Sequence, residues 1–236
     1  MHMSANSANA ASTANAARLA IMKRSTVLIL KTLVWIGCLL PLATAIYEAV
    51  TNTLGPDPTA QLASITGLTA LWMLAGTLAI SPLRSLSPRL SWLIKFRRLL
   101  GLFVFFYASL HMLTWLGLYA GFDLTTITAD ITKRRFIIMG VTTWLLLLPL
   151  AVTSTTWAIR KLGGKNWNRL HMLVYLAALT AMAHYWWKVK TGVMSPAPYT
   201  LVILVLLGIR PLLAWNRKRK ARAASSRPGN LASIEP

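Results

Sequence analysis

Apolar stretches of about 20 residues recur along this chain of 236 residues, and each is long enough for a helix to cross the hydrocarbon core of a bilayer. Backbone polar groups in lipid need internal hydrogen-bond partners, so such stretches are expected to be helical. Only 13% of the residues are charged, about half of the share typical of soluble domains. The sequence therefore predicts an all-α integral membrane protein, a six-helix bundle. The six predicted spans are residues 27–46, 60–80, 96–119, 136–157, 167–187 and 199–215.

The segments outside the spans are short or biased in composition, so one membrane domain is expected. We expect a disordered cytoplasmic leader at residues 1–24, a transmembrane domain at 25–216 and a basic, disordered cytoplasmic tail at 217–236. The leader, the apolar run that follows it and Ala43-Thr44-Ala45 resemble a secretory signal with its cleavage site. That apolar run is longer than in a typical signal, which favours an uncleaved first helix. No internal repeat is evident.

The basic residues predict the orientation, because cytoplasmic connections of membrane proteins are enriched in Lys and Arg. With six spans, 20 of the 25 basic residues fall on the side that holds both termini. Both termini are therefore predicted to be cytoplasmic. The net charge of +20 is then a topology signal and a contact with lipid headgroups, not a nucleic-acid footprint. The five basic residues on the opposite side are Lys133, Arg134, Arg135, Lys188 and Lys190.

Three of the four histidines lie within or at the edges of the predicted spans, where an ionisable side chain is costly and indicates a function. His111 lies roughly 22 Å along the third span, and His184 lies about 26 Å along the fifth, which runs in the same direction. These two histidines therefore share an outer depth and are candidates for the axial ligands of a haem between two helices. His171 lies only about 6 Å along the fifth span, near the cytoplasmic edge.

His171 and His184 are 13 residues apart, which places them about 140° out of phase on an ideal helix. Either the fifth helix is locally distorted or the two imidazoles point in different directions. His171 is then a ligand of a second haem, an alternative to His184, or a group at the electron entry. A structural hydrogen bond to a neighbouring helix is the simpler alternative for each histidine.

A haem fits these residue types better than zinc does. Structural zinc needs four protein ligands, whereas a haem needs one or two axial ligands. Arg97, Arg98 and Arg169 are candidate cofactor-binding residues, because guanidinium groups pair with propionates, flavin phosphates or quinone headgroups. Contact with anionic lipid is the alternative for these arginines. No glycine-rich dinucleotide fingerprint is present, so binding of NAD(P)H is not expected.

Three segments resemble the MsrQ family, haem-binding membrane subunits within the wider group of ferric-reductase-like transmembrane domains. They are residues 97–115 (RRLLGLFVFFYASLHMLTW), 145–155 (LLLLPLAVTST) and 162–184 (LGGKNWNRLHMLVYLAALTAMAH).

The resemblance extends from about residue 25 to 215 and implies haem b, held by His111, His171 and His184, with flavin mononucleotide (FMN) as a further cofactor. It also implies a multi-pass protein of the bacterial inner membrane. The wider group often holds a second haem between two further histidines, but Arg97 or Arg98 stands where the third helix would supply one.

The function that the resemblance implies is electron transfer. Electrons would pass from the quinone pool to a periplasmic molybdopterin reductase (MsrP-like) that repairs methionine sulfoxide in oxidised periplasmic proteins. This chain would be the quinol-oxidising subunit, not the one that reduces methionine sulfoxide. A stand-alone ferric or oxygen reductase is the alternative, although the polar tail leaves no room for a fused flavin domain. A transporter is less favoured, because the spans hold few charges.

Overall fold

The structure, a computed structural model, describes residues 24–189 and 195–225, and all regular structure in these ranges is helical. Residues 1–23 of the expected leader and 226–236 of the expected tail lie outside the described residues. The chain divides into two compact units, residues 1–43 and 44–236. Most of α2 (Arg24–Val50) belongs to the first unit, and Pro41 lies inside this helix.

The second unit contains four further long helices and α9. They are α3 (Pro58–Leu86), α4 (Ile94–Leu113), α6 (Arg135–Val152), α9 (Leu173–Lys188) and α10 (Ala197–Ser225). The shorter elements are the 3-10 helix η1 (Pro88–Leu93), the π-helix η2 (Thr114–Tyr119), α5 (Leu124–Lys133), α7 (Thr156–Leu162) and α8 (Gly164–Leu170).

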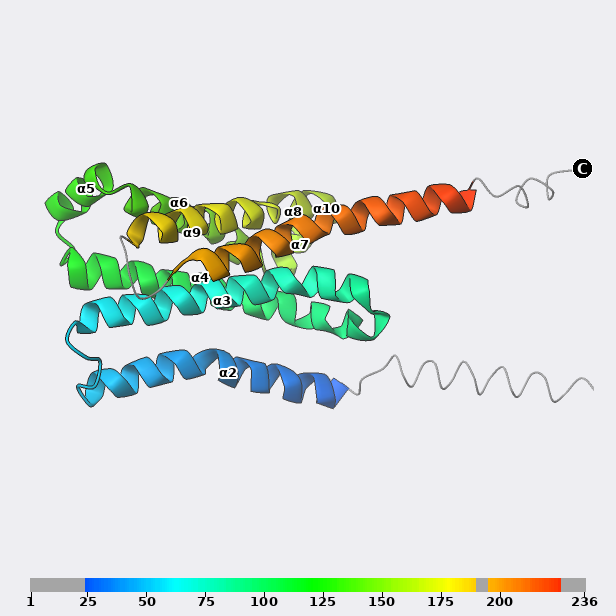
Figure 1. Ribbon diagram of the computed structural model, residues 1–236. Helices are drawn as coiled ribbons and strands as arrows, with labels where there is room; N and C mark the ends of the chain where they lie inside the picture. Colours follow the sequence, from blue (N-terminus) through cyan, green and yellow to red (C-terminus); the bar gives the residue numbers. More distant parts are fainter. Residues whose placement is uncertain (1–23, 190–194, 226–236) are drawn as a thin grey trace, which may run out of the picture. The chain divides into compact units, whose positions relative to one another are not determined.

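The helices of the second unit are arranged around two pairs. α3 packs along α4, and α6 packs along α9, while α10 lies against α3 and α4 contacts α6 (Figure 1). Ala177 and Ala178 of α9 are fully buried, since small side chains let helices approach closely. Leucines such as Leu74 and Leu78 of α3 fill the core around them.

Local signals in the sequence explain where several helices begin. Asp57 caps α3 by accepting a hydrogen bond from the backbone of Ala60 at 2.9 Å, and Pro58 occupies the first turn, where its missing N–H costs nothing. Thr155 caps α7 in the same way. Gly163 ends α7 with a φ of +74°, a conformation that glycine adopts without strain.

Within residues 24–189 and 195–225, four segments have the length and hydropathy of membrane spans: Thr26–Val50, Pro58–Ser85, Leu90–Tyr119 and Arg135–Val152. They correspond to the first four spans expected from the sequence. The apolar part of α10, Ala197–Leu213, is shorter, and α9 has 16 residues. The prediction of an all-helical membrane protein is therefore confirmed. The number of six membrane-spanning helices and the cytoplasmic location of the termini stay predictions.

The structure differs from the expected spans in three places. The fourth span was expected to reach residue 157, but α6 ends at Val152 and a turn separates it from α7. The fifth, expected at residues 167–187, is broken into α8 and α9 at His171 and Met172. α10 continues to Ser225, beyond the expected domain end at 216, because Ala, Lys and Arg are strong helix formers.

Candidate functional site

His111 lies on α4 and is held against α3 by a hydrogen bond. Its Nδ1 donates to the backbone carbonyl of Ala63 at 2.9 Å, and the hydroxyl of Thr66 lies 3.4 Å from the same nitrogen. Because a carbonyl only accepts, Nδ1 carries the proton and Nε2 keeps a free lone pair. An imidazole oriented in this way is prepared to bind a metal through Nε2.

His184 on α9 is held against α6 in the same manner. Its Nδ1 donates to the carbonyl of Phe136 at 2.6 Å, and the ring of Phe136 contacts the imidazole edge-on with centroids 5.9 Å apart. The Nε2 atom of His184 is therefore also left with a free lone pair. Each histidine lies 48 residues after the residue that accepts its hydrogen bond.

A glycine makes each of these contacts possible. A Cβ atom added to Gly67 would lie 3.0 Å from the His111 ring, and one added to Gly140 would lie 2.8 Å from Nδ1 of His184. Both glycines stand four residues after the accepting carbonyl, where the next turn of the helix would otherwise place a side chain over it. The two helix pairs thus repeat one arrangement, a carbonyl and a glycine that seat an imidazole, which was not evident in the sequence.

The two histidines face each other across a shared cavity. Their ring centroids are 5.8 Å apart and their planes are nearly perpendicular, at 89°. The cavity has a volume of about 980 Å³, and both imidazoles line it. A metal bound to each Nε2 at about 2 Å would separate two such centroids by roughly 6 Å. The spacing therefore fits one metal ion between the rings.

The donor set distinguishes a haem from a bare ion. Among residues 24–189 and 195–225, no three His, Cys, Asp or Glu residues converge in a way that could hold a metal ion. Two imidazoles are too few for structural zinc, but His111 and His184 would suffice to hold a haem, because the porphyrin itself supplies the other iron ligands. The predominantly apolar cavity walls, which include Leu71, Leu74, Val104 and Leu147, suit a porphyrin ring.

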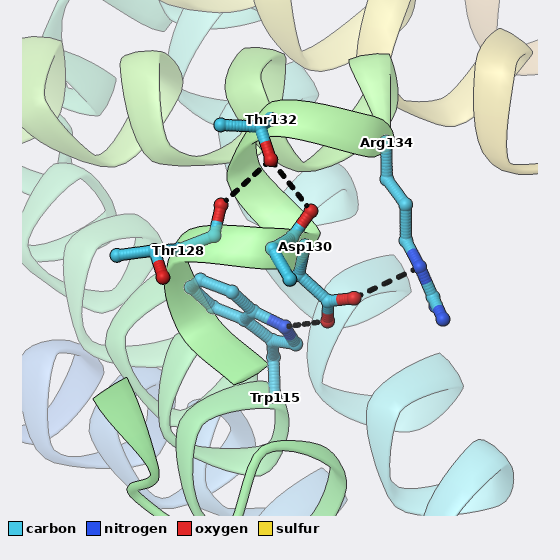
Figure 2. A network of polar contacts seen from close by, with 6 residues as sticks. Trp115, Thr128, Asp130, Thr132 and Arg134 are labelled. Atoms are coloured by element: carbon cyan, nitrogen blue, oxygen red, sulfur yellow. Dashed lines mark hydrogen bonds and ion pairs between the residues drawn. The ribbon is translucent and has the colours of Figure 1, made fainter. Parts of the chain in front are cut away.

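Figure 2 shows a network of polar contacts around Asp130, in which two members, Trp115 and Arg134, line the cavity. The indole N–H of Trp115 in η2 donates to Asp130 at 3.1 Å, and Nε of Arg134 forms an ion pair with the same carboxylate at 2.9 Å. Within α5, the hydroxyl of Thr132 donates to the carbonyl of Thr128. Asp130 therefore ties η2 to the start of α6, and both Trp115 and Arg134 line the cavity.

Asp123 begins α5 and sets the geometry of that segment. Its carboxylate accepts hydrogen bonds from the backbone N–H groups of Thr125 and Thr126 and from both hydroxyls. Hydrogen bonds from Thr125 and Thr126 lower the pKa of Asp123 well below its usual range, since they favour the charged form.

The structure places His171 apart from the other two histidines. It stands at the break between α8 and α9, stacked on Trp167 with ring centroids 3.8 Å apart. Its Nε2 lies 3.2 Å from the hydroxyl of Thr153, and the indole of Trp167 donates to the Thr153 carbonyl. His171 does not line the cavity. The 13-residue spacing is thus accommodated by a helix break, and the two imidazoles address different sites.

The arginines singled out in the sequence also lie away from the cavity. None of Arg97, Arg98 and Arg169 lines it, and Arg98 and Arg169 are exposed. Arg97 is half-buried near Arg210. The guanidinium of Arg210 donates to the hydroxyl of Tyr175 and to the carbonyl of Leu78.

The charged residues that do line the cavity are among the basic residues that the sequence places on the side opposite the termini. They are Lys133, Arg134, Arg135 and Lys188. Their positions carried a usable signal, since Arg135 directly precedes Phe136 and Lys188 follows His184 by one helical turn. The proximity of Arg135 and Lys188 depends on the packing of α6 against α9, which the sequence does not show.

The helices are long enough to cross a membrane, and a pair of histidines lies between them. These two features together define a class of protein: helical membrane proteins that can hold a haem between their helices. Residues 60–182 match the family described as ferric reductase like transmembrane component. This match, together with the apolar helices, makes the chain a multi-pass membrane protein.

Comparison with curated proteins identifies the particular family. The protein-methionine-sulfoxide reductase heme-binding subunit MsrQ of Xanthomonas oryzae pv. oryzae (strain MAFF 311018) is 42% identical over 212 residues, which cover 86% of this chain and 95% of that protein. The protein of the same description from Herminiimonas arsenicoxydans is 41% identical over 83% of this chain and 90% of its own length. The protein of the same description from Xanthomonas campestris pv. campestris (strain B100) is 46% identical over 75% of this chain and 80% of its own length. The chain belongs to the MsrQ family.

Proposed function

We propose that this chain is a haem b electron-transfer subunit of a methionine sulfoxide reductase system. The observation that carries the proposal is the facing pair His111 and His184, each with Nδ1 bound to a carbonyl and Nε2 free. The relatives' description as heme-binding subunits supports the same cofactor. His111 and His184 are the proposed axial ligands, and the haem when bound supplies reversible one-electron chemistry.

The protein's own contribution is to orient and bury the redox site. The carbonyls of Ala63 and Phe136 fix both imidazole tautomers, and such hydrogen bonds raise the basicity of a metal-ligating histidine. The apolar walls exclude water, which limits the charge reorganisation that electron transfer requires. These features tune the potential of a bound haem through ligation and burial.

The direction of electron flow completes the proposal. The distribution of basic residues supports cytoplasmic termini in the bacterial inner membrane, so that the cavity lies near the periplasmic side. Electrons would enter from the quinone pool, with FMN as a further cofactor, and leave to a periplasmic molybdopterin reductase (MsrP-like). His171, with Arg97, Arg98 and Arg169, lies toward the opposite, entry end, where these residues are candidates for a second cofactor or quinone contact.

Absorption spectroscopy tests the ligand pair. The protein is expressed with ample haem, purified in mild detergent and measured oxidised and dithionite-reduced. We expect a haem b spectrum that is lost or converted to a five-coordinate form in His111→Ala and His184→Ala. His171→Ala is the control and should keep the spectrum of the haem that His111 and His184 are proposed to hold. Absence of a Soret band from the wild type, or a fully retained haem spectrum in a His111→Ala/His184→Ala double variant, contradicts the proposal.

Electron delivery separates the relay from a stand-alone reductase. The haem-loaded protein is reduced with a quinol, and reoxidation of the haem is followed after addition of the periplasmic reductase and a methionine sulfoxide substrate. A relay should reoxidise quickly only when both are present. Equally rapid reoxidation by ferric chelates or oxygen alone would support the alternative function.

A further inference from the structure

The cavity between the two helix pairs has a strongly asymmetric charge distribution. Four charged residues line it, all of them basic: Lys133, Arg134, Arg135 and Lys188. Three of them surround the start of α6 and the fourth ends α9, so all lie at the histidine end. The rest of the lining is apolar or uncharged. The cavity is therefore apolar inside with a basic mouth.

Membrane topology does not account for this basic mouth. Lys and Arg are retained preferentially on the cytoplasmic side, and the predicted orientation places only five basic residues on the opposite side. Four of those five line the cavity, and the fifth, Lys190, lies outside the described residues. Basic residues that oppose the topology signal and gather at one cavity have another role.

The acidic partners of the basic mouth are few. Asp130 pairs with Arg134, whereas Lys133, Arg135 and Lys188 form no ion pair among the described residues. Asp57 lines a second hollow together with Lys188 but forms no ion pair with it. Lys188 lines the same cavity as His111 and His184. Unpaired cations beside an apolar cavity are suited to a ligand with an apolar body and anionic groups on one edge.

We propose that Arg135 and Lys188 bind the two propionate carboxylates of the haem, with the propionate edge directed toward the mouth. The inference rests on the proposed function, because it concerns the cofactor of the same cavity. Arg135 adjoins the residue that accepts the hydrogen bond of His184, and Lys188 lies one turn beyond His184, so the two cations flank one axial ligand from opposite helices. Asp130 is a positioning residue that keeps Arg134 beside them.

Binding of haem b and of haem dimethyl ester to the apoprotein tests this assignment. The ester keeps the ring and iron but lacks the carboxylate charges. The full chain is produced under haem limitation, placed in lipid nanodiscs and titrated with each compound, with the Soret band as the readout. The variants are the double replacement Arg135→Gln/Lys188→Met and the matched control Arg160→Gln/Lys165→Met, whose exposed residues do not line the cavity.

We expect the wild type to bind haem b about tenfold or more tightly than the ester, the value of at least one charge-assisted hydrogen bond. The double replacement should reduce this preference to nearly one by weakening haem b alone, and the control should keep it. The midpoint potential of the bound haem should also fall in the double replacement, because two positive charges near the iron are lost.

Three results overturn the inference or its basis, and they are distinguishable. A full preference for haem b in the double replacement shows that other groups bind the carboxylates. Equal binding of both compounds by the wild type shows that the carboxylates make no specific contact, although a haem site exists. Failure of the wild type to bind either compound contradicts the proposed function itself. If the double replacement does not fold, Lys188→Met and Arg135→Lys are measured singly, and an unchanged preference in Lys188→Met overturns its role.

Discussion

His111 of α4 and His184 of α9 face each other with ring centroids 5.8 Å apart, although their positions in the chain differ by 73. Each ring is fixed by a hydrogen bond to a neighbouring helix and by the absence of a side chain at one glycine. The facing pair is therefore a product of two separate helix contacts. Four predictions about stability and local structure follow from these and related contacts.

The glycine beneath His184 is expected to be intolerant of even a methyl group. In Gly140→Ala the new Cβ would lie 2.8 Å from Nδ1 of His184, so the imidazole must move and lose its carbonyl partner. Overpacking of this kind costs about 1–3 kcal/mol. We expect lower haem content and an altered reduced spectrum. Gly76→Ala is the matched control, because nothing lies within 4 Å of its added Cβ; equal effects of the two replacements would contradict this account.

The carboxylate of Asp130 is expected to couple η2 to α6. Trp115→Phe removes the indole donor together with part of the ring, and Asp130→Asn weakens both that hydrogen bond and the ion pair with Arg134. Each single replacement should destabilise by about 1 kcal/mol. Because both act on one network, their effects should not add. Thermal unfolding in detergent measures the cycle, and strict additivity would show that the contact carries no energy of its own.

The N-cap of α5 is expected to weaken in acid. The pKa of Asp123 is lowered by its hydrogen bonds in the folded state, so its contribution is fully present above the ordinary carboxyl pKa of about 4 and is lost as the pH falls toward the folded value. Hydrogen exchange of Thr125 and Thr126, corrected for intrinsic rates, should show less protection at low pH.

Asp123→Ser provides the control for that pH dependence. Serine is an equally good N-cap residue but does not titrate in this range. The variant should therefore keep α5 folded and lose the acid-dependent change. If the serine variant shows the same decrease in protection, the carboxylate of Asp123 is not its source.

The hydroxyl of Tyr175 is expected to contribute to the packing of α10. It accepts a hydrogen bond from Arg210, whose guanidinium also reaches the carbonyl of Leu78 in α3. Tyr175→Phe leaves a half-buried cation with one acceptor fewer, at a cost of about 1–3 kcal/mol. Tyr199→Phe, which removes a hydroxyl without a hydrogen bond in the described structure, should cost less. Unfolding in mixed micelles would compare them.

Several properties of this protein follow from short-range features of its sequence. Helical spans could be predicted because hydropathy over about 20 residues and the backbone's need for internal hydrogen bonds are local properties. The matching depths of His111 and His184 followed from counting residues along two helices. The caps at Asp57 and Asp123 are likewise local features. The helix α5 itself is short and polar, so apolar periodicity does not predict it.

Tertiary structure alone decided how these parts combine. Which carbonyl receives each imidazole depends on the pairing of α3 with α4 and of α6 with α9, and the importance of Gly67 and Gly140 appears only once a histidine from another helix lies above them. Two further features also depend on tertiary structure. One is the helix break between His171 and His184, and the other is the position of Arg135 and Lys188 at the same cavity mouth. The sequence by itself determined a helical membrane protein with histidines at defined depths; contacts between residues far apart in the chain determined which of them form a site, because packing is not encoded by any single segment.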